Sequence, residues 1–164
     1  MPLTLRPATP EDAAAMAALL NEIIAIGGTT AYEDPFDRQK MIDAYVSAPN
    51  LVCCTIAEES GLILGFQGLF HPEPDDPMPA GWAFIATFAR VGRTGGGVGR
   101  ALFGETRRRA QVAGITTIDA TIRADNAGGL KYYSGLGFVD YGRLAGAPLK
   151  DGTPVDRIRK CFDL

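Results

Sequence analysis

The sequence has few of the residues that metal sites and disulfide frameworks require. It contains one histidine, His71, and three cysteines among 164 residues. These counts exclude a disulfide-stabilised scaffold and a zinc site built from Cys and His ligands, and they argue against a nucleophile paired with histidine. We therefore expect no metal. No apolar run approaches the ~20 residues that cross a bilayer, so we expect no membrane partner.

An excess of charge of either sign is also absent. Sixteen Lys and Arg residues against nineteen Asp and Glu residues give a net charge of -3. This balance does not favour a protein that binds nucleic acid through bulk charge. The hydrophobic fraction of 46% is typical of a folded chain, and the length is close to that of one domain spanning residues 1–164. The first residues have no apolar secretory core, which predicts a cytoplasmic protein.

Hydrophobic patterning predicts strands and helices in alternation. The order is one strand, two helices, three strands, a helix, a strand, a helix and two strands. The predicted strands are 3–6, 51–58, 62–71, 82–91, 116–123, 138–144 and 155–162, and the predicted helices are 9–26, 34–45, a segment ending near 113, and 126–134. Strands mixed with crossover helices indicate an α/β sheet that is covered on both faces.

Glycine, in contrast, is abundant, with 20 residues, and it is concentrated in one segment. Between Arg93 and Arg100, four of the five residues 95–99 are glycine, and the segment lies between a predicted strand and a predicted helix. Closely approaching backbone N–H groups and a helix N-terminus favour a phosphate or pyrophosphate ligand, with the two arginines as further contacts. A P-loop would need Lys and Ser or Thr where Arg100-Ala101 stands, and a dinucleotide fingerprint would need glycine in place of Leu102.

Two motifs resemble those of the GNAT superfamily of acyl-CoA-dependent N-acyltransferases. Gly97-Val98-Gly99 matches the end of that family's Gln/Arg-x-x-Gly-x-Gly/Ala motif, although Thr94 stands in the Gln/Arg position. The segment from Asn126 to Phe138 is similar to its Asn-x-x-Ala-x-x-x-Tyr-x-x-x-Gly-Phe motif, with Gly129 at the small residue and Tyr133 at the tyrosine. Residues 21–33 faintly resemble the phosphinothricin-acetyltransferase-like branch.

The resemblance implies a fold and a reaction. The implied GNAT fold has a central mixed, mostly antiparallel sheet of six to seven strands, flanked by about four helices. The implied reaction moves an acetyl group from acetyl-CoA to a primary amine of a small molecule within a ternary complex, and a homodimer is a further expectation from the family. The positions implied to bind the cofactor are Ala89, Val91, Arg93, Thr94, Gly95, Gly96, Gly97, Val98, Gly99, Arg100, Asn126, Gly129 and Tyr133.

The chemistry requires an acid for the departing thiolate and a base for the amine. Tyr133, with an ordinary pKa near 10, suits the acid role, and the alternative is that it is a buried helix aromatic. The family also implies a carbonyl-polarising backbone N–H near Ala89. For the base we place Glu33 first, then His71, then Asp119, with water as a further alternative.

Three alternative functions stay open from the sequence. The first is a GNAT-fold module that binds acyl-CoA without transferring the acyl group, and the second is a protein or peptide N-acetyltransferase. The third is a nucleotide-binding enzyme that uses the glycine segment. Acidic loops, among them Glu33 and Asp34, favour a cationic acceptor amine, unless these carboxylates are only solvated.

Overall fold

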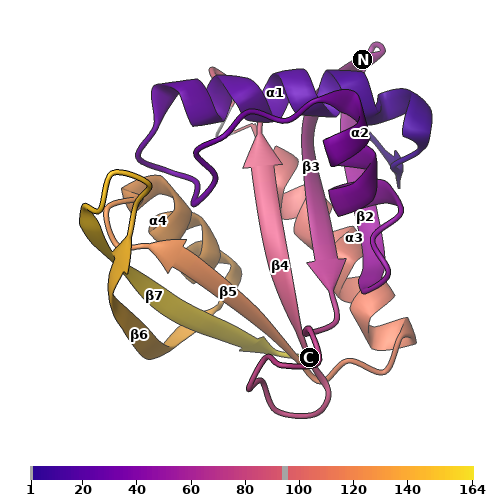
Figure 1. Cartoon of the computed structure of the whole chain (residues 1–164). Coiled ribbons are helices and arrows are strands. Elements are labelled where there is room, and N and C mark those ends of the chain that lie inside the picture. Colours follow the sequence, from indigo (N-terminus) through magenta and orange to yellow (C-terminus); the bar gives the residue numbers. More distant parts are fainter. Residues whose placement is uncertain (1, 94–95) are drawn as a thin grey trace.

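The computed structural model describes residues 2–93 and 96–164, which form a seven-stranded sheet flanked by helices (Figure 1). The strands lie in the order β1-β2-β3-β4-β5-β7-β6. Their bounds are β1 Thr4–Pro7, β2 Leu51–Glu59, β3 Leu62–Phe70, β4 Trp82–Ala89, β5 Thr117–Arg123, β6 Val139–Pro148 and β7 Pro154–Asp163. The helices are α1 Ala13–Ile26, α2 Arg38–Met41, α3 Val98–Val112 and α4 Ala127–Leu136. The predicted order of strands and helices is confirmed.

Neighbouring strands run antiparallel at every junction of the sheet but one. β4 and β5 are parallel, because α3 carries the chain back to the starting end of β4 before β5 begins. β7 lies between β5 and β6, so β5 pairs with β7 rather than with β6, the next strand along the chain. The mixed, mostly antiparallel sheet expected from the sequence is therefore confirmed.

Helices cover both faces of the sheet. Successive side chains of β4 point alternately to one face and to the other. Phe84 and Phe88 pack in the cluster that α1 and α2 share with the sheet, which we call the front face. Ala83 and Ile85 point the other way, into the cluster beneath α3 and α4, which we call the rear face. Figure 1 shows α1 crossing in front of the sheet and α3 behind it. The core thus has two apolar layers with β4 between them.

The segment that we predicted as one helix over 34–45 is shorter and irregular. The α-helix covers only Arg38–Met41 and continues as one π-helical turn, η2 (Ile42–Val46). Its N-cap is Asp37, whose carboxylate accepts the N–H of Lys40 at 2.7 Å. Asp34 instead forms an ion pair with Lys150, in the turn between β6 and β7.

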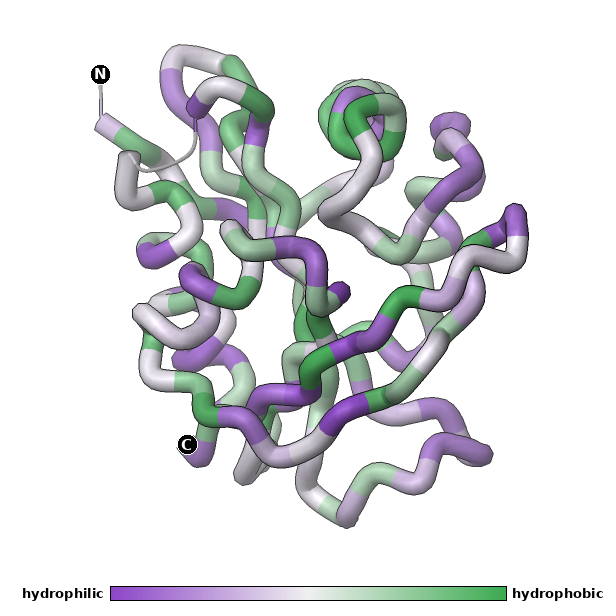
Figure 2. The backbone as a smooth tube through the Cα atoms, turned by 90° about the vertical axis from the view of Figure 1, so that its left-hand side faces the viewer, coloured by the Kyte–Doolittle hydropathy of each residue, from purple (hydrophilic) through white to green (hydrophobic). Residues whose placement is uncertain are grey.

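The β6–β7 hairpin forms one edge of the sheet and is mostly exposed. Hydrophilic and hydrophobic residues alternate along the strands nearest the viewer in Figure 2. On the rear face, the buried Lys160 ties the hairpin to α4 by a 3.0 Å bond to the Ser134 hydroxyl. Among the described residues, no helix is long and apolar enough to span a membrane.

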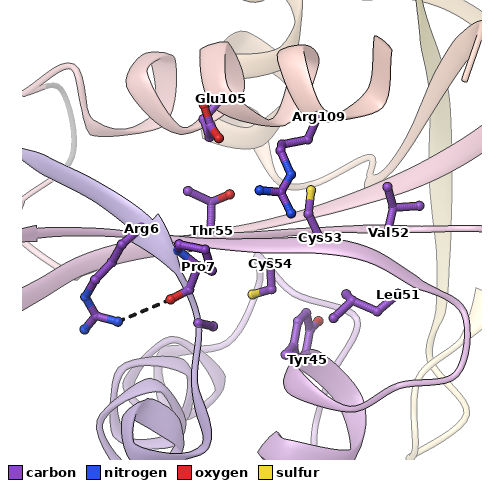
Figure 3. A pocket seen from close by; sticks show the side chains of 11 residues that line it. Arg6, Pro7, Tyr45, Leu51, Val52, Cys53, Cys54, Thr55, Glu105 and Arg109 are labelled. Carbon is purple, nitrogen blue, oxygen red and sulfur yellow. Dashed lines mark hydrogen bonds between the residues drawn. The ribbon is translucent and has the colours of Figure 1, made fainter. Parts of the chain in front are cut away.

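A cavity of about 180 Å³ lies where β1 ends beside β2 (Figure 3). The adjacent cysteines of β2 point to opposite faces there, Cys53 toward Arg109 of α3 and Cys54 toward Tyr45, as strand alternation predicts. Burial raises the pKa of Cys53 to about 11 and raises that of Cys54 further. Both thiols therefore stay protonated near neutral pH, so neither is a nucleophile.

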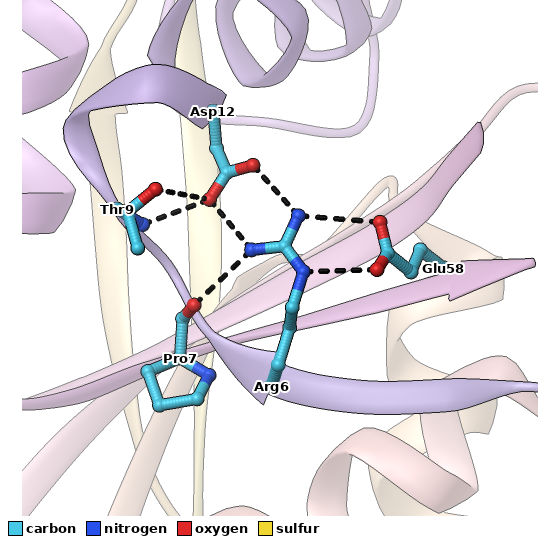
Figure 4. A network of polar contacts seen from close by, with 5 residues as sticks. All are labelled: Arg6, Pro7, Thr9, Asp12 and Glu58. Carbon is cyan, nitrogen blue, oxygen red and sulfur yellow. Dashed lines mark hydrogen bonds and ion pairs between the residues drawn. The ribbon is translucent and has the colours of Figure 1, made fainter. Parts of the chain in front are cut away.

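A charged network joins β1 to the start of α1 and to β2 (Figure 4). The Arg6 guanidinium donates to both carboxylate oxygens of Asp12, at 2.8 and 2.7 Å, and to those of Glu58, at 2.9 and 3.2 Å. The bonds from Arg6 lower the pKa of Asp12 to about 2, with the Thr9 N–H as a further donor. The network fixes how the chain enters α1, and so how α1 lies on the front face.

Replacing Arg6 with glutamine is expected to lower the free energy of unfolding by about 2 kcal/mol at pH 7. Because the folded pKa of Asp12 lies below its ordinary value of 3.8, this contribution is complete above that value and is lost as the pH falls through about 2. The variant should lose this acid sensitivity. Urea unfolding between pH 2 and 7 measures both effects. Arg108→Gln is the control, since its pair with Glu105 is exposed to solvent and an exposed pair contributes little to stability. Equal losses in the two variants would contradict the assignment.

Candidate active site

The ladder between β4 and β5 ends early, and the two strands then separate. It holds three pairs, Trp82 with Thr117, Ala83 with Ile118 and Phe84 with Asp119. Figure 1 shows β4 and β5 diverging beyond this point. On its β5 side, β4 has no ladder partner from Ile85 to Ala89. This free strand edge is where an extended ligand can pair with the backbone.

The N–H groups that face the free edge follow from the pairing with β3. The N–H of Arg90 donates to the carbonyl of Leu64 at 2.8 Å, on the β3 side. Successive N–H groups along a strand point to opposite sides. The N–H groups of Ala89 and Thr87 therefore face the free edge. Ala89 occupies the position expected from the family motif, and Thr87, two residues nearer the point of separation, was not predicted.

Tyr133 meets β4 at Thr87 on the rear face. The Tyr133 hydroxyl lies 2.7 Å from the Thr87 Oγ1, and the side chain is buried at 7% exposure. Burial raises the pKa of Tyr133, although the bond with Thr87 opposes that shift. The phenol thus keeps its proton near neutral pH, which a general acid must do. One residue, Thr87, therefore brings a free-edge N–H and the phenol of Tyr133 to the same point of β4.

The neighbouring tyrosine is part of the same polar cluster. Gln67 on β3 donates to the Thr87 Oγ1 at 2.8 Å and to the Tyr132 hydroxyl at 3.2 Å. The Tyr132 hydroxyl donates to the carbonyl of Gly99 at 2.6 Å. A Cβ on Gly99 would lie 2.6 Å from the Tyr132 ring, so glycine is required there for packing. Tyr132 therefore packs against Gly99 and also bonds two polar groups.

The glycine segment delivers the start of α3 to this cluster. Gly97 is the N-cap with φ +82°, a conformation that favours glycine. The first intrahelical bond runs from the N–H of Ala101 to Gly97, which leaves the N–H groups of Val98, Gly99 and Arg100 without an intrahelical partner. Gly96 and Arg100 are exposed. The predicted residues Thr94 and Gly95 lie outside the described residues.

Two other predicted contacts of the cofactor are exposed, and one of them is engaged within the chain. Val91 is 44% exposed in the turn after β4. Arg93 is exposed and pairs with Glu59 at 3.1 Å.

Asn126 and Gly129 at the start of α4 have structural roles. The Asn126 carboxamide oxygen accepts the N–H of Gly129 at 2.9 Å, and its nitrogen donates to the carbonyl of Thr29 at 3.0 Å. Asn126 therefore caps α4 and holds the loop that follows α1. A Cβ on Gly129 would lie 2.5 Å from the Asn126 side chain, so the space at Gly129 is filled from within the chain.

The front face beside the strand separation carries a buried carboxylate. Asp119 is 2% exposed and accepts hydrogen bonds from the hydroxyls of Tyr141 and of Thr121, the latter at 3.0 Å. Arg159 of β7 pairs with it at 3.4 Å. Burial raises the pKa of Asp119, against the opposing effect of the Tyr141 bond and of Arg159. Asp119 is thus the predicted base candidate that lies at the point where β4 and β5 separate.

The other two base candidates lie elsewhere. Glu33 is exposed in the loop between α1 and α2, where its carboxylate accepts the N–H of Lys150 at 2.7 Å. His71 is exposed and directly follows Phe70, which pairs with Phe84 near the start of β4. The structure therefore brings Tyr133 to Thr87, two residues before Ala89, and its neighbour Tyr132 to the start of α3. Asp119 lies on the opposite face, beside Phe84, and His71 lies near the start of β4.

The sequence reasoning missed Thr87, Gln67, Tyr141 and Arg159. A signal existed for one of them, since Gln67 is the one strongly polar residue in the apolar run Leu62–Phe70.

A family model described as "Acetyltransferase (GNAT) domain" matches residues 2–139. A crystal structure of an N-acetyltransferase from Staphylococcus aureus is 21% identical, covers 99% of both chains and has a TM-score of 0.85. A "putative acetyltransferase" from Salmonella typhimurium with its cofactor acetyl-CoA is 19% identical, covers 99% of this chain and 94% of its own, and has a TM-score of 0.84. A "putative phosphinothricin N-acetyltransferase" is 26% identical over 99% of both chains, with a TM-score of 0.82. A search of proteins of curated function found no significant match.

The family match spans most of the chain, and the architecture agrees with it. The chain belongs to the GNAT acetyltransferase family, and its sheet and helices have the GNAT fold that the two sequence motifs implied. It is therefore an acyl-CoA-dependent acetyltransferase by class.

Proposed function

We propose that this protein transfers an acetyl group from acetyl-CoA to a primary amine of a small molecule, by direct attack within a ternary complex formed on one domain of residues 1–164. The observation that carries the proposal is the position of Thr87. Its N–H faces the free edge of β4, and its hydroxyl bonds the buried phenol of Tyr133. A thioester carbonyl and its sulfur lie next to each other, so this point can serve both atoms.

The cofactor would extend from the start of α3 along the free edge of β4. The N–H groups of the first turn of α3, which have no intrahelical partner, suit a pyrophosphate, with Arg100 beside them. The amide groups of the pantetheine arm would pair with the N–H of Ala89 as an added strand does. The proposed binding residues thus remain those of the glycine segment. For Thr94 and Gly95, the sequence motif is the sole support.

The chemical step forms a C–N bond and breaks a C–S bond. The amine nitrogen attacks the thioester carbonyl. The developing oxyanion accepts a hydrogen bond from the N–H of Thr87. When the C–S bond breaks, the thiolate of coenzyme A takes the proton of Tyr133. Because Tyr133 bonds Thr87, we assign the carbonyl contact to Thr87 and the pantetheine contact to Ala89. No covalent enzyme intermediate is needed.

The amine must also lose a proton, and we assign its acceptor as Asp119. Asp119 lies on the front face, opposite Tyr133, so an amine attacking from that side would leave its proton there. The Tyr141 hydroxyl, bonded to Asp119, can pass the proton on, as can an intervening water. The raised pKa of Asp119 makes it a stronger base than an ordinary aspartate. Glu33 stays a prediction for this role.

We propose that the acceptor amine carries an acidic group. Glu33 and Asp34 are bonded to Lys150, so the loop after α1 offers less free negative charge than its sequence indicates. Arg157 lies on the same face of β7 as Arg159 and opposite Arg123 of β5, and it is half-buried. Its guanidinium makes no hydrogen bond within the described part of the chain. A half-buried guanidinium without such a partner can bind a carboxylate or phosphinate group of a substrate. The similarity to a "putative phosphinothricin N-acetyltransferase" supports the same class.

Thermal unfolding with acetyl-CoA, ATP or NAD tests the cofactor. At ~100 times its Kd, acetyl-CoA should stabilise the protein by ~2.7 kcal/mol, a shift of a few degrees, while ATP and NAD should not. Release of the coenzyme A thiol in a panel of amines, with and without a carboxylate, then tests transfer. Stabilisation without thiol release from any amine would overturn the proposal in favour of a binding module.

A further inference from the structure

Gln67 is a fully buried carboxamide in the middle of the central strand β3. Its nitrogen makes two hydrogen bonds, to Thr87 and Tyr132, while its oxygen has no partner among the described residues. A buried acceptor without a partner lowers stability, so an apolar side chain would serve packing better at this position. The glutamine therefore requires another explanation, and its two donated bonds indicate one.

The orientation of the carboxamide is set by Tyr132. A phenol has one hydrogen, and that of Tyr132 is committed to the Gly99 carbonyl at 2.6 Å. Toward Gln67, the Tyr132 oxygen can therefore only accept. The amide nitrogen must face it, and the second hydrogen of that nitrogen then points to the Thr87 Oγ1 at 2.8 Å.

The bond between Thr87 and Tyr133 acquires a direction in consequence. Since the Thr87 oxygen accepts from Gln67, its own hydrogen is available for the Tyr133 oxygen, 2.7 Å away. With Thr87 as the donor, the hydrogen of Tyr133 is free to go to the departing thiolate. The same Thr87 hydrogen then stabilises the phenolate that Tyr133 becomes.

We propose that Gln67 is a positioning residue for acetyl transfer: through Thr87, it makes Tyr133 a hydrogen-bond acceptor within the protein and thereby a proton donor to the cofactor. This inference rests on the function proposed above. It adds that the start of α3 determines which groups donate in the hydrogen bonds from Gln67 to Thr87 and on to Tyr133, because Tyr132 donates its hydrogen to Gly99 there. The binding loop and the acid are thus joined through two tyrosines that are adjacent in sequence but point to different partners.

Two variants remove the donated bonds without adding charge. Gln67→Met keeps the volume, and Thr87→Val keeps the shape but removes the hydroxyl. Each is expected to lower kcat about tenfold or more, because a hydrogen bond to the phenolate is lost or misdirected. The KM for acetyl-CoA should change by less than about twofold. Thr87→Ser keeps the hydroxyl and should therefore have most of the wild-type kcat, in contrast to Thr87→Val. Thr106→Val is the control, since it removes a fully buried hydroxyl of α3 that has no partner among the described residues.

A double-mutant cycle separates positioning from general loss of structure. If Gln67 acts through Tyr133, Gln67→Met should lower kcat in the wild-type background and have no further effect in the Tyr133→Phe background. Equal reductions in both backgrounds, or an unchanged kcat in a folded Gln67→Met variant, would overturn the inference. Failure of the proposed function is distinguishable, because then the wild-type protein itself would release no thiol with any amine. If Gln67→Met does not fold, as judged by its melting curve, the same cycle is measured with Thr87→Val.

Discussion

Replacing Tyr133 with phenylalanine is expected to lower kcat for acetyl transfer by about 100-fold, the size of effect that a general acid typically supplies. The phenylalanine ring keeps the packing against Phe138, so the variant loses a hydroxyl and one hydrogen bond to Thr87. The expected loss in stability is about 1 kcal/mol. The acetyl-CoA-dependent shift in melting temperature should persist, because the proposed phosphate contacts are at the start of α3 and do not involve Tyr133.

The matched control for this variant is Tyr45→Phe. Tyr45 is also a buried tyrosine, at 1% exposure, and among the described residues its hydroxyl bonds only the hydroxyl of Tyr32, at 2.9 Å. Its removal should leave kcat within about twofold, since no proton of the reaction passes through it. Thiol release measured at saturating acetyl-CoA and amine compares the two variants. A kcat for Tyr133→Phe equal to that of Tyr45→Phe would show that another group, or water, protonates the thiolate.

The contiguous parts of the site could be predicted from the sequence. The glycine segment and the motif that contains Tyr133 are each a run of neighbouring residues, so their spacing is visible without any tertiary structure. The strand before the glycine segment places Ala89 for the same reason. Local conformation fixes these positions in the fold, through the N-cap Gly97 with φ +82° and the cap of α4 at Asn126, while their roles in binding and catalysis stay predictions.

The contacts between distant segments could not be predicted. Gln67 and Tyr132 are 65 positions apart, and Thr87 and Tyr133 are 46 apart. Their meeting depends on the register of β3 against β4 and on where α4 packs, and a shift of one residue would turn each side chain to the other face. Hydropathy alone marks Gln67 as unusual but gives no partner for it.

The order in which we placed the candidate bases was affected by the same limitation. Asp119, which we placed third, alternates with apolar residues along its strand, and polar faces of this kind usually meet solvent. Here β7 is inserted between β5 and β6, so Arg159 and Tyr141 close over the carboxylate. Pairing out of chain order leaves no signal in local patterns. Asp34, whose following proline favours a helix cap, is likewise engaged by Lys150, 116 positions away.

Replacing Asp119 with asparagine is expected to lower kcat by about 100-fold and to leave the fold intact. Burial raises the folded pKa of Asp119 above its ordinary value of 3.8, so the buried charge opposes folding at neutral pH. The wild-type protein regains this stability only as the pH falls through the folded pKa. Asparagine carries no charge to desolvate and still accepts from Tyr141. The melting temperature of the variant at pH 7 should therefore not be lower than that of the wild type.

The pH profile provides the stronger test of this assignment. For the wild type, kcat should fall as the pH is lowered through a value above 3.8, because protonated Asp119 cannot accept the proton of the amine. Asp119→Asn should lose that acidic limb together with its activity. Asp163→Asn is the control and should keep both kcat and the limb. Within the described part of the chain, this exposed carboxylate of β7 bonds only Thr117, which is in β5 like Asp119. A preserved limb in Asp119→Asn, combined with its loss in Glu33→Gln, would assign the proton to Glu33 and place the amine at the loop after α1.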